Sequence, residues 1–299
     1  MENPNSLTIG RHGLTRTYKI PAYFVLAFII TWLGALIYSF TLPKNGQLLP
    51  AFLNFPGAVI WYYGPFAAAL IVTRFTGGKG SIRKLLKRFL VWRVGWVWYA
   101  FILLYPLLLH LIVVGLDWLL AGSVPVFFQA EGVASGNIWL TLMMLVLFNA
   151  LIRGIGEETG WRGFALPHLQ SRMSALTASL VLGVLWALWH FNPANFPALL
   201  STSGVFIFLN ITFTTVIYTW VYNHTKGSLL IAALFHMTLN VTEYVVPIGI
   251  IHAGFTRNIL QILVILFVAI MLLLVSGPQL GKEGGSTSKS RTGFPQSLQ

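Results

Sequence analysis

The chain has 299 residues, of which 56% are hydrophobic and 9% are charged, and its formal net charge is +12. Its mean hydropathy of +0.76 lies far outside the range of soluble globular proteins, so we expect an integral membrane protein. The cations lie in short loops between apolar runs and are not gathered on a soluble face, which argues against nucleic-acid binding. The absence of cysteine excludes disulfides, thiolate nucleophiles and Cys-ligated metals, so any catalysis must use oxygen and nitrogen groups.

Apolar runs long enough to cross a bilayer recur along the whole chain. A span needs about 20 mostly apolar residues. This template predicts eight spans, at about 21–42, 57–75, 94–120, 137–155, 174–192, 204–222, 228–248 and 258–276. The predicted fold class is therefore all-α, a polytopic membrane helix bundle forming a single domain over 1–276. Residues 277–299 have too few apolar side chains to fold alone and are expected to form a disordered cytoplasmic tail.

The basic residues fix the expected orientation of these spans. The first run, 21–42, is too long for a cleavable signal and is interpreted as a retained span. With the N-terminus in the cytoplasm, most Lys and Arg side chains fall in cytoplasmic segments, and Lys44 and Arg257 remain on the other side. Both termini are thus expected in the cytoplasm. The segment 81–93 is either a basic amphipathic stretch on the anionic inner leaflet or an ordinary basic loop.

A first polar cluster, Glu157-Glu158-x-x-x-Arg162, follows the fourth run and the glycines at 154, 156 and 160. Those glycines favour close helix contact or local irregularity. Residues four apart share a helix face, so Glu158 can reach Arg162 while Glu157 points about 100 degrees away. Burial disfavours the ionised form of an unpaired carboxylate, which suits Glu157 to accept a proton from water. The alternative is that this cluster is a helix end whose charges are solvated by water and have no role in catalysis.

Two further polar clusters contain histidine. His190 ends the run Trp186-Ala187-Leu188-Trp189, where a lone histidine is more often a packing residue. His236 and Asn240 are four apart within apolar sequence, so both project from one face toward the bundle interior. An interhelical hydrogen-bond clamp would explain this pair equally well. Glu243 can share the same face as a further acid or a supporting residue, although a carboxylate near a span end is the simpler reading.

Together these residues can hydrolyse a peptide bond in two ways. In the first, Glu157 and His190 activate a water while His236 and Asn240 donate hydrogen bonds to the oxyanion. In the second, Glu157, His190 and His236 bind Zn²⁺ as three ligands with an open fourth position. The sequence leaves both open, and the compact H-E-x-x-H zinc signature is absent. A non-proteolytic immunity factor, scaffold or proton-relay carrier is the alternative function.

The predicted topology contains one conflict. A fifth span that begins at Ser174 and runs outward carries His190 toward the outer membrane surface, whereas Glu157 and His236 lie in the cytoplasmic half. Either the fifth span is displaced or tilted, or the stretch 156–172 is itself partly embedded.

With these residues identified, the sequence resembles the CAAX prenyl protease and bacteriocin-processing (CPBP, Abi) family of intramembrane proteases. The family carries E-E-x-x-x-R, F-x-x-x-H and H-x-x-x-N or H-x-x-x-D in separate membrane segments. Glu157, Glu158 and Arg162 match the first motif, His190 matches the second, and His236 with Asn240 matches the third. The resemblance covers about 150–245. Trp186 stands where the second motif usually has Phe.

The resemblance implies a helical bundle with a glutamate-led endopeptidase site open toward the membrane and the cytoplasm. A metal requirement has been described both ways in the family, so Zn²⁺ remains an open cofactor. The implied partners are the lipid bilayer and a membrane-associated or lipidated protein or peptide substrate. Eukaryotic members process prenylated CAAX proteins, and prokaryotic members include ones tied to bacteriocin maturation or self-immunity. A prokaryotic cytoplasmic membrane is the expected location.

Overall fold

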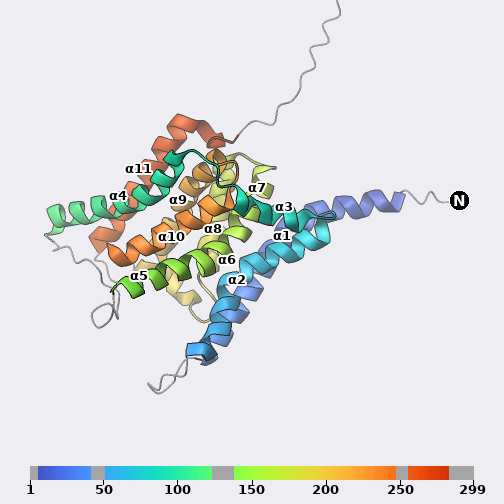
Figure 1. Ribbon diagram of the computed structural model, residues 1–299, viewed down its shortest axis with the longest axis horizontal. Coiled ribbons are helices and arrows are strands. Elements are labelled where there is room, and N and C mark those ends of the chain that lie inside the picture. Colours follow the sequence, from blue (N-terminus) through green and yellow to red (C-terminus); the bar gives the residue numbers. More distant parts are fainter. Residues whose placement is uncertain (1–5, 42–50, 123–137, 247–254, 283–299) are drawn as a thin grey trace, which may run out of the picture.

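The protein is all-helical in a computed structural model that describes residues 6–41, 51–122, 138–246 and 255–282 (Figure 1). The predicted fold class is confirmed, and the described residues contain no strand. The long helices are α1 (Ser6–Thr41), α2 (Ala51–Thr76), α4 (Trp96–Ala121), α9 (Thr202–His224) and α11 (Phe255–Ser276). The shorter elements between them are α3 (Ser81–Leu86), η1 (Lys87–Leu90), α8 (Ala175–Trp189), η5 (Phe196–Leu200), α10 (Leu229–Val245) and η6 (Gly277–Gln279).

Each predicted apolar run contains a helix, but the runs differ in length. Six stretches of the described chain are long and apolar enough to cross a membrane. The other two, α8 and α10, have 15 and 17 residues. At 1.5 Å per residue they extend about 22 and 25 Å, less than the roughly 30 Å hydrocarbon core. These two short helices carry all the predicted histidines of the site, and longer helices surround them.

The fourth span differs most from its prediction. Instead of ending at 155, the helical stretch runs from Ile138 to Gln170, a length of 33 residues. It consists of α5 (Ile138–Leu147), η3 (Phe148–Gly154), α6 (Ile155–Gly160), η4 (Trp161–Ala165) and α7 (Leu166–Gln170). The acidic cluster therefore lies in the middle of a long helix.

This longer helix removes the conflict over His190. The helical stretch from Glu157 to Gln170 is about 20 Å long, and α8 runs back in the opposite direction for about 22 Å from Ala175 to His190. Both residues consequently reach the same level of the bundle. Of the two explanations that the sequence allowed, the extension of helix through 156–170 is the one observed.

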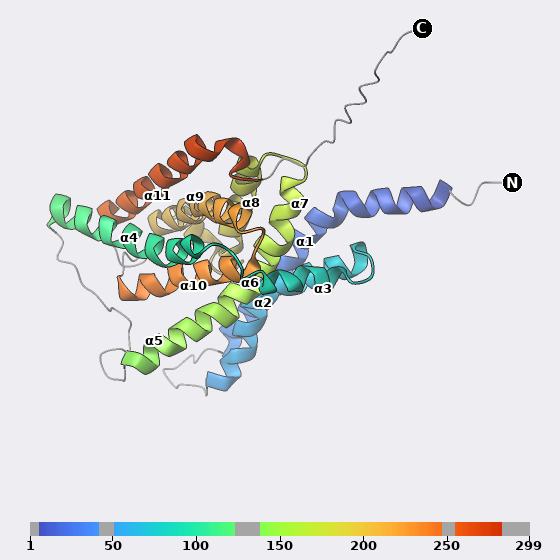
Figure 2. The same ribbon diagram turned by 45° about the horizontal axis from the view of Figure 1, so that its top comes forward.

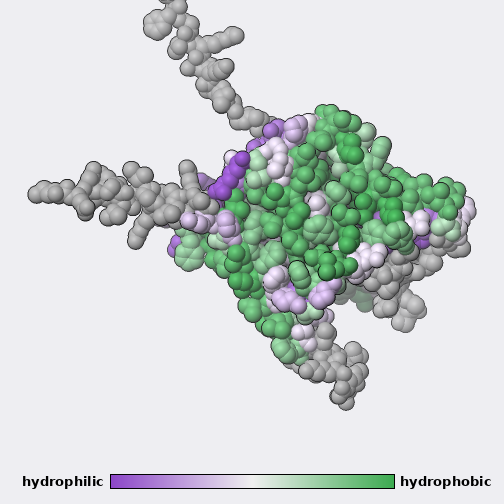
Figure 3. Space-filling view, turned by 180° about the vertical axis from the view of Figure 1, so that it is seen from behind, coloured by the Kyte–Doolittle hydropathy of each residue, from purple (hydrophilic) through white to green (hydrophobic). Residues whose placement is uncertain are grey.

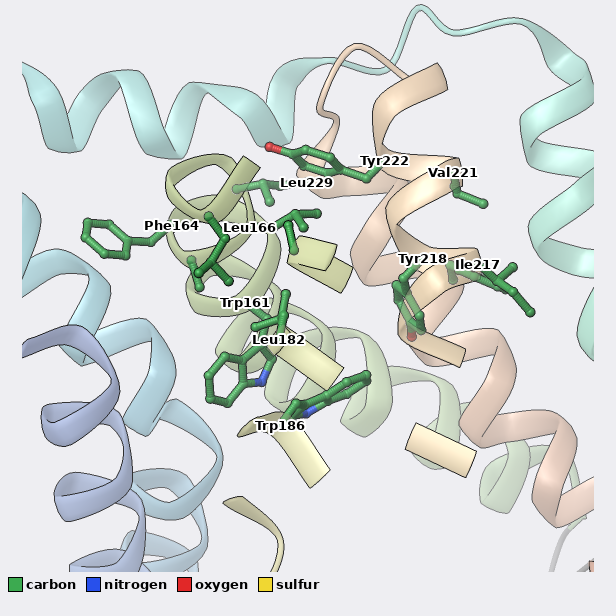
Figure 4. Packing of buried hydrophobic residues seen from close by; sticks show 14 of the residues in the cluster. Trp161, Phe164, Leu166, Leu182, Trp186, Ile217, Tyr218, Val221, Tyr222 and Leu229 are labelled. Carbon is green, nitrogen blue, oxygen red and sulfur yellow. The ribbon is translucent and has the colours of Figure 1, made fainter. Parts of the chain in front are cut away.

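The helices form two groups that are joined through the long helical stretch from Ile138 to Gln170, called the site helix below. In Figures 1 and 2, α1 and α2 lie side by side and extend away from the remaining helices, α4 and α8 to α11, which pack as a bundle. α6 packs against α2 on one side and α10 on the other. The shared core is rich in aromatic residues, and Figure 4 shows Trp161, Leu182 and Trp186 close together with Tyr218 across from them.

Serine side chains begin three of the helices in the bundle. The hydroxyls of Ser174, Ser201 and Ser228 accept hydrogen bonds from the backbone N–H groups three residues ahead, at the starts of α8, α9 and α10. Each bond satisfies an N–H group that has no carbonyl partner in the first helical turn. These caps fix where the two short helices start, and hence how far along each helix its histidine lies.

The outer surface is mostly apolar. Large hydrophobic side chains are exposed along α4, α5 and α11, among them Leu103, Met144 and Phe267. Figure 3 shows a face that is hydrophobic over most of its area, with the strongly hydrophilic residues at its margins. Exposed apolar area of this extent marks a surface that faces lipid. The protein is therefore an integral membrane protein.

Basic residues gather at one end of the bundle. Arg88, in η1, donates hydrogen bonds to the carbonyl oxygens of Gly163 and Gly227, and its guanidinium lies over the ring of Tyr222. Burial lowers the pKa of Arg88 to about 10, so the side chain remains charged at neutral pH. This contact brings the basic segment 81–93 to the level of η4 and the start of α10. The membrane location of 81–93 and the cytoplasmic orientation of the termini stay predictions.

The C-terminal part of the chain is described only to residue 282. η6 follows α11, and the side chain of Leu280 is buried against α8 and α9. Residues 283–299 of the predicted tail lie outside the described residues, and the single-domain boundary at 276 stays a prediction.

Candidate active site

Small residues and irregular turns position the acidic cluster. The π-helical segments η3 and η4 flank the six residues of α6 on both sides. A Cβ atom at Gly156 would lie 2.6 Å from the carbonyl oxygen of Tyr62, and one at Gly160 would lie 2.6 Å from that of Pro65. Any larger residue would push α6 away from α2. The predicted close contact and the predicted irregularity are both present, and π-helical turns are frequent at functional sites.

Glu158 lies at the centre of a fully buried ion pair. Its Oε1 atom accepts a hydrogen bond of 2.9 Å from Nη1 of Arg162, and Nδ1 of His236 lies 2.8 Å from the same oxygen. Glu158 and Arg162 are both 0% exposed. The predicted contact between Glu158 and Arg162 is thus present, and Glu158 also joins α6 to α10. A buried carboxylate with two such partners holds the histidine ring in a defined orientation.

Aromatic rings enclose the other side of Arg162. The centre of its guanidinium lies 3.9 Å from the ring centroid of Tyr218 and 4.3 Å from that of Trp186. Tyr218 comes from α9 and Trp186 from α8, so the arginine ties three helices together. Cation–π contacts of this kind gain strength when water is excluded.

Glu157 faces a different neighbour. Its Oε2 atom accepts a hydrogen bond of 2.9 Å from the indole nitrogen of Trp186, and the residue is 2% exposed. No ion pair of the described residues includes Glu157. The two adjacent glutamates therefore differ as the helix geometry predicts: Glu158 is bound to a cation, and Glu157 is held by a neutral donor.

His190 caps the C-terminus of α8 beside this carboxylate. Its Nδ1 atom lies 2.8 Å from the carbonyl oxygen of Trp186, and that contact orients the ring. With Nδ1–H donating to this carbonyl, Nε2 is left as an acceptor. His190 also interacts electrostatically with both Glu157 and His236. The ring of Trp186 lies 6.0 Å from the ring of His190 and 5.7 Å from that of His236, measured between centroids.

Asn240 follows His236 by one helical turn on α10, as expected. Its Nδ2 atom is buried and has no hydrogen-bond partner within the described part of the chain. A buried donor without a partner carries a desolvation penalty, which a ligand that accepts its hydrogen bond removes.

Three of the six predicted residues, Glu158, Arg162 and His236, are in direct contact. Glu157 and His190 are both hydrogen-bonded to Trp186, and Asn240 follows His236 by one turn of α10. Sequence reasoning assigned no role to Tyr218 or to the indole N–H of Trp186. Nothing in the spacing of Tyr218 marks it, because its contact with Arg162 depends on how α9 packs. Glu243 lies apart from the site, with Oε2 3.7 Å from Nε2 of His110.

The zinc alternative can be tested against the same geometry. Among the residues that the structure describes, no group of three His, Asp or Glu side chains is arranged to hold a metal ion. Nδ1 of His236 and Nη1 of Arg162 meet at a single oxygen of Glu158, so a fixed positive charge already lies beside the proposed ligands. The described side chains of Glu157, His190 and His236 are thus not grouped around a common metal position in this arrangement.

An apolar cavity of about 560 Å³ lies next to the C-terminal end of α8. It is lined by α1, α2 and the segment after His190, including Trp32, Trp61 and Asn192. The indole of Trp32 donates a hydrogen bond to the carbonyl oxygen of Trp189, the residue before His190. The volume of the cavity falls within the usual range of about 300–1,000 Å³ for pockets that bind small molecules.

The comparisons with known proteins cover this same region. The sequence model of the family described as "Type II CAAX prenyl endopeptidase Rce1-like" matches residues 139–242, which contain all three motifs. The chain is also 28% identical over 246 residues to CAAX prenyl protease 2 of Methanococcus maripaludis, covering 77% of this chain and 86% of that protein. The resemblance to the CAAX prenyl protease family is confirmed. This resemblance supports intramembrane endopeptidase activity.

Trp186 is the position at which this CAAX-protease-like chain departs from the usual motif. A phenylalanine there would keep the ring contacts but could not donate a hydrogen bond to Glu157. We expect Trp186→Phe to lower kcat/KM about tenfold to a hundredfold, because hydrogen bonds to charged groups contribute roughly 1.5–3 kcal/mol. Peptide-cleavage kinetics would measure the change.

The matched control is Trp189→Phe. The indole of Trp189 also donates a buried hydrogen bond, but its acceptor is the hydroxyl of Thr31, 2.8 Å away. This variant should lose stability and keep the rate constant of the folded fraction. Unchanged kinetics in Trp186→Phe would show that the indole N–H does not matter to Glu157.

Proposed function

We propose that this chain is an intramembrane endopeptidase that hydrolyses a peptide bond in the C-terminal segment of a prenylated, membrane-anchored protein. The observation that carries the proposal is the environment of Glu157, a buried carboxylate that is held by a neutral donor and lies beside His190 among apolar helices. Glu158 is paired with Arg162 and His236, whereas the hydrogen-bond donor to Glu157 is the neutral indole of Trp186.

In the proposed first step, a water bound between Glu157 and His190 attacks the scissile carbonyl. Glu157 accepts one proton from the water, and Nε2 of His190 accepts a hydrogen bond that orients the oxygen. The new carbon–oxygen bond forms as the carbonyl π electrons move to oxygen, which gives a tetrahedral oxyanion. General-base assistance of this kind contributes about a hundred- to ten-thousandfold in rate.

His236 and Asn240 are proposed to stabilise that oxyanion. Nδ1 of His236 faces the carboxylate of Glu158, so a ring protonated on both nitrogens can donate from Nε2 with Glu158 as its counter-ion. Nδ2 of Asn240 supplies a second donor that the protein leaves without a partner. Donors fixed in place before the charge develops are usually the largest single contribution to such a reaction.

The second step breaks the carbon–nitrogen bond. The tetrahedral intermediate collapses, the oxyanion electrons restore the carbonyl, and the amine leaves. Glu157, now protonated, gives its proton to the leaving nitrogen and returns to the carboxylate form. One water is consumed, and the products are a new carboxyl terminus and a released peptide.

The substrate class follows from the surroundings of the site. CAAX is a C-terminal motif whose cysteine carries an isoprenyl thioether. The apolar cavity beside His190 is bordered by α1 side chains such as Ile29 and Leu33, which are about half exposed on the lipid-facing surface. A prenyl chain can therefore pass from the bilayer into this cavity while its cysteine lies near Glu157.

The test uses purified full-length protein in phospholipid vesicles with a CAAX peptide bearing an S-farnesyl or S-geranylgeranyl cysteine, or free cysteine. We expect mass spectrometry to detect cleavage of the prenylated peptides at least tenfold faster than that of the free-cysteine peptide. His190→Ala should lower the rate by about a hundredfold or more. Glu243→Gln, which alters a carboxylate outside the site, should keep the wild-type rate.

Absence of cleavage of every prenylated peptide by folded protein would refute the proposed function. Equal rates for His190→Ala and wild type would refute the assigned site instead.

A further inference from the structure

Arg153 lies one helical turn before Glu157 and has no role in the chemistry described above. It belongs to η3, and its Nη2 atom donates a hydrogen bond of 3.1 Å to the hydroxyl of Tyr62 on α2. The guanidinium lies 5.1 Å from the ring centroid of Tyr62 and 5.7 Å from that of Phe148. Two aromatic rings therefore hold this side chain in place.

Arg153 lies in the field of Glu157 but forms no ion pair with it at contact distance. Its Nε atom is buried and unbonded, and no ion pair within the described ranges includes this residue. Two other arginines within the spanning helices differ, since Arg162 is paired with Glu158 and Arg257 with Asp117. A cation inside a membrane protein is expensive unless it is paired, so such a residue marks a binding function.

Arg153 also borders the site. It interacts electrostatically with Glu157 and with His190. The side chain is only half-buried, so a ligand can approach it. Tyr62, which stacks against it, directly follows Trp61 of the apolar cavity wall. The cation, the cavity and the proposed base are therefore neighbours around α2 and the site helix.

We propose that Arg153 binds the C-terminal α-carboxylate of the substrate and thereby selects peptides that end a few residues beyond the scissile bond. This inference rests on the proposed function. Guanidinium groups match carboxylates geometrically, and the Nη atoms at the tip of the half-buried Arg153 side chain can donate hydrogen bonds to one. The substrate carboxylate would supply the contact ion pair that Arg153 lacks among the described residues.

The dimensions agree with a CAAX terminus. Three residues follow the prenylated cysteine, and in extended form they span about 10 Å. Arg153 precedes Glu157 by four residues, which is about 6 Å along a helix axis. The length of the Arg153 side chain extends its reach by several ångströms more. A bond cut beside Glu157 thus leaves the terminal carboxylate within reach of Arg153. A peptide with a longer extension would place its carboxylate beyond this reach.

The experiment compares prenylated peptides that end in a free carboxylate or in a carboxamide. The wild-type enzyme should cleave the free acid with a kcat/KM about tenfold to a hundredfold higher than the amide. The difference should lie mainly in KM, because the carboxylate does not change during the reaction. In Arg153→Gln the two peptides should be cleaved equally, and Arg153→Lys should restore part of the preference.

Arg93→Gln is the matched control, since Arg93 also stacks on an aromatic ring, that of Trp92, but lies in the loop before α4. It should keep the wild-type acid-to-amide ratio. A wild-type enzyme that cleaves acid and amide equally would overturn the proposal for Arg153 and leave the proposed function intact. So would an Arg153→Gln variant that keeps the full preference while its pH profile shifts, since Arg153 would then act on Glu157.

The phosphate group of a lipid is also an anion that Arg153 could bind. Assays in micelles and in vesicles distinguish binding of a lipid phosphate from binding of the substrate carboxylate. The acid-to-amide ratio is measured in maltoside micelles, which contain no phosphate, and in phosphatidylglycerol vesicles. Loss of the ratio in Arg153→Gln in both media supports recognition of the carboxylate. A defect of Arg153→Gln that occurs only in vesicles and affects both peptides equally would assign Arg153 to the lipid and overturn the proposal.

Discussion

Glu157→Gln is expected to lower kcat for a prenylated CAAX peptide by about a hundred- to ten-thousandfold, with little change in KM. Glutamine has nearly the same shape and can still accept the hydrogen bond from Trp186, so the contacts around residue 157 survive. What disappears is a group that can take a proton from water. Single-turnover cleavage assays with folded protein would measure the loss.

Two neighbouring carboxylates make this prediction specific. Glu243→Gln should leave kcat unchanged, because Glu243 lies beside His110 and outside the site. Glu158→Gln should reduce both activity and stability, since Glu158 holds Arg162 and His236. A Glu157→Gln enzyme with more than about a tenth of the wild-type kcat would assign the proton transfer to another group.

The sequence was sufficient to predict the all-helical membrane fold and the different environments of the two glutamates. Both follow from short-range geometry. A run of about 20 apolar residues forms a helix in a membrane whatever surrounds it, and residues 158 and 162 face each other on any helix. The pairing of Glu158 with Arg162 needed no knowledge of the tertiary structure.

Three features could not be predicted because they depend on packing between helices. The site helix continues to Gln170 through residues that include charges, because those charges are paired or stacked inside the bundle. Tyr218 contacts Arg162 only through the position of α9. The motif marks Trp186 only as an aromatic residue in place of Phe, whereas its indole N–H donates a hydrogen bond to Glu157 on a different helix.

Arg153 illustrates the same limit. On sequence alone it is one more cation near the end of an apolar run. Only the contacts show that Tyr62 and Phe148 enclose it while no carboxylate of the described residues forms an ion pair with it. The absence of such a pair is a property of the folded chain, which no residue spacing reports.

The largest expected effect on stability comes from Arg162. Arg162→Met should destabilise the protein by about 3–5 kcal/mol, because Glu158 keeps His236 as a partner but loses its permanent cation in a fully buried site. Methionine fills much of the same volume between Tyr218 and Trp186, so a cavity explains little of the loss. Unfolding by denaturant in mixed micelles would measure the free energy, and a stability equal to that of wild type would contradict this view of the pair.

A double variant separates stability from chemistry. Replacing both members, as Arg162→Met with Glu158→Leu, removes the buried charges together, and such exchanges are often neutral or stabilising. We therefore expect the double variant to recover most of the stability lost in Arg162→Met. It should remain inactive, because His236 then lacks the carboxylate that orients it and balances its charge. Recovery of both stability and activity would mean that the pair is structural and that His236 acts without Glu158.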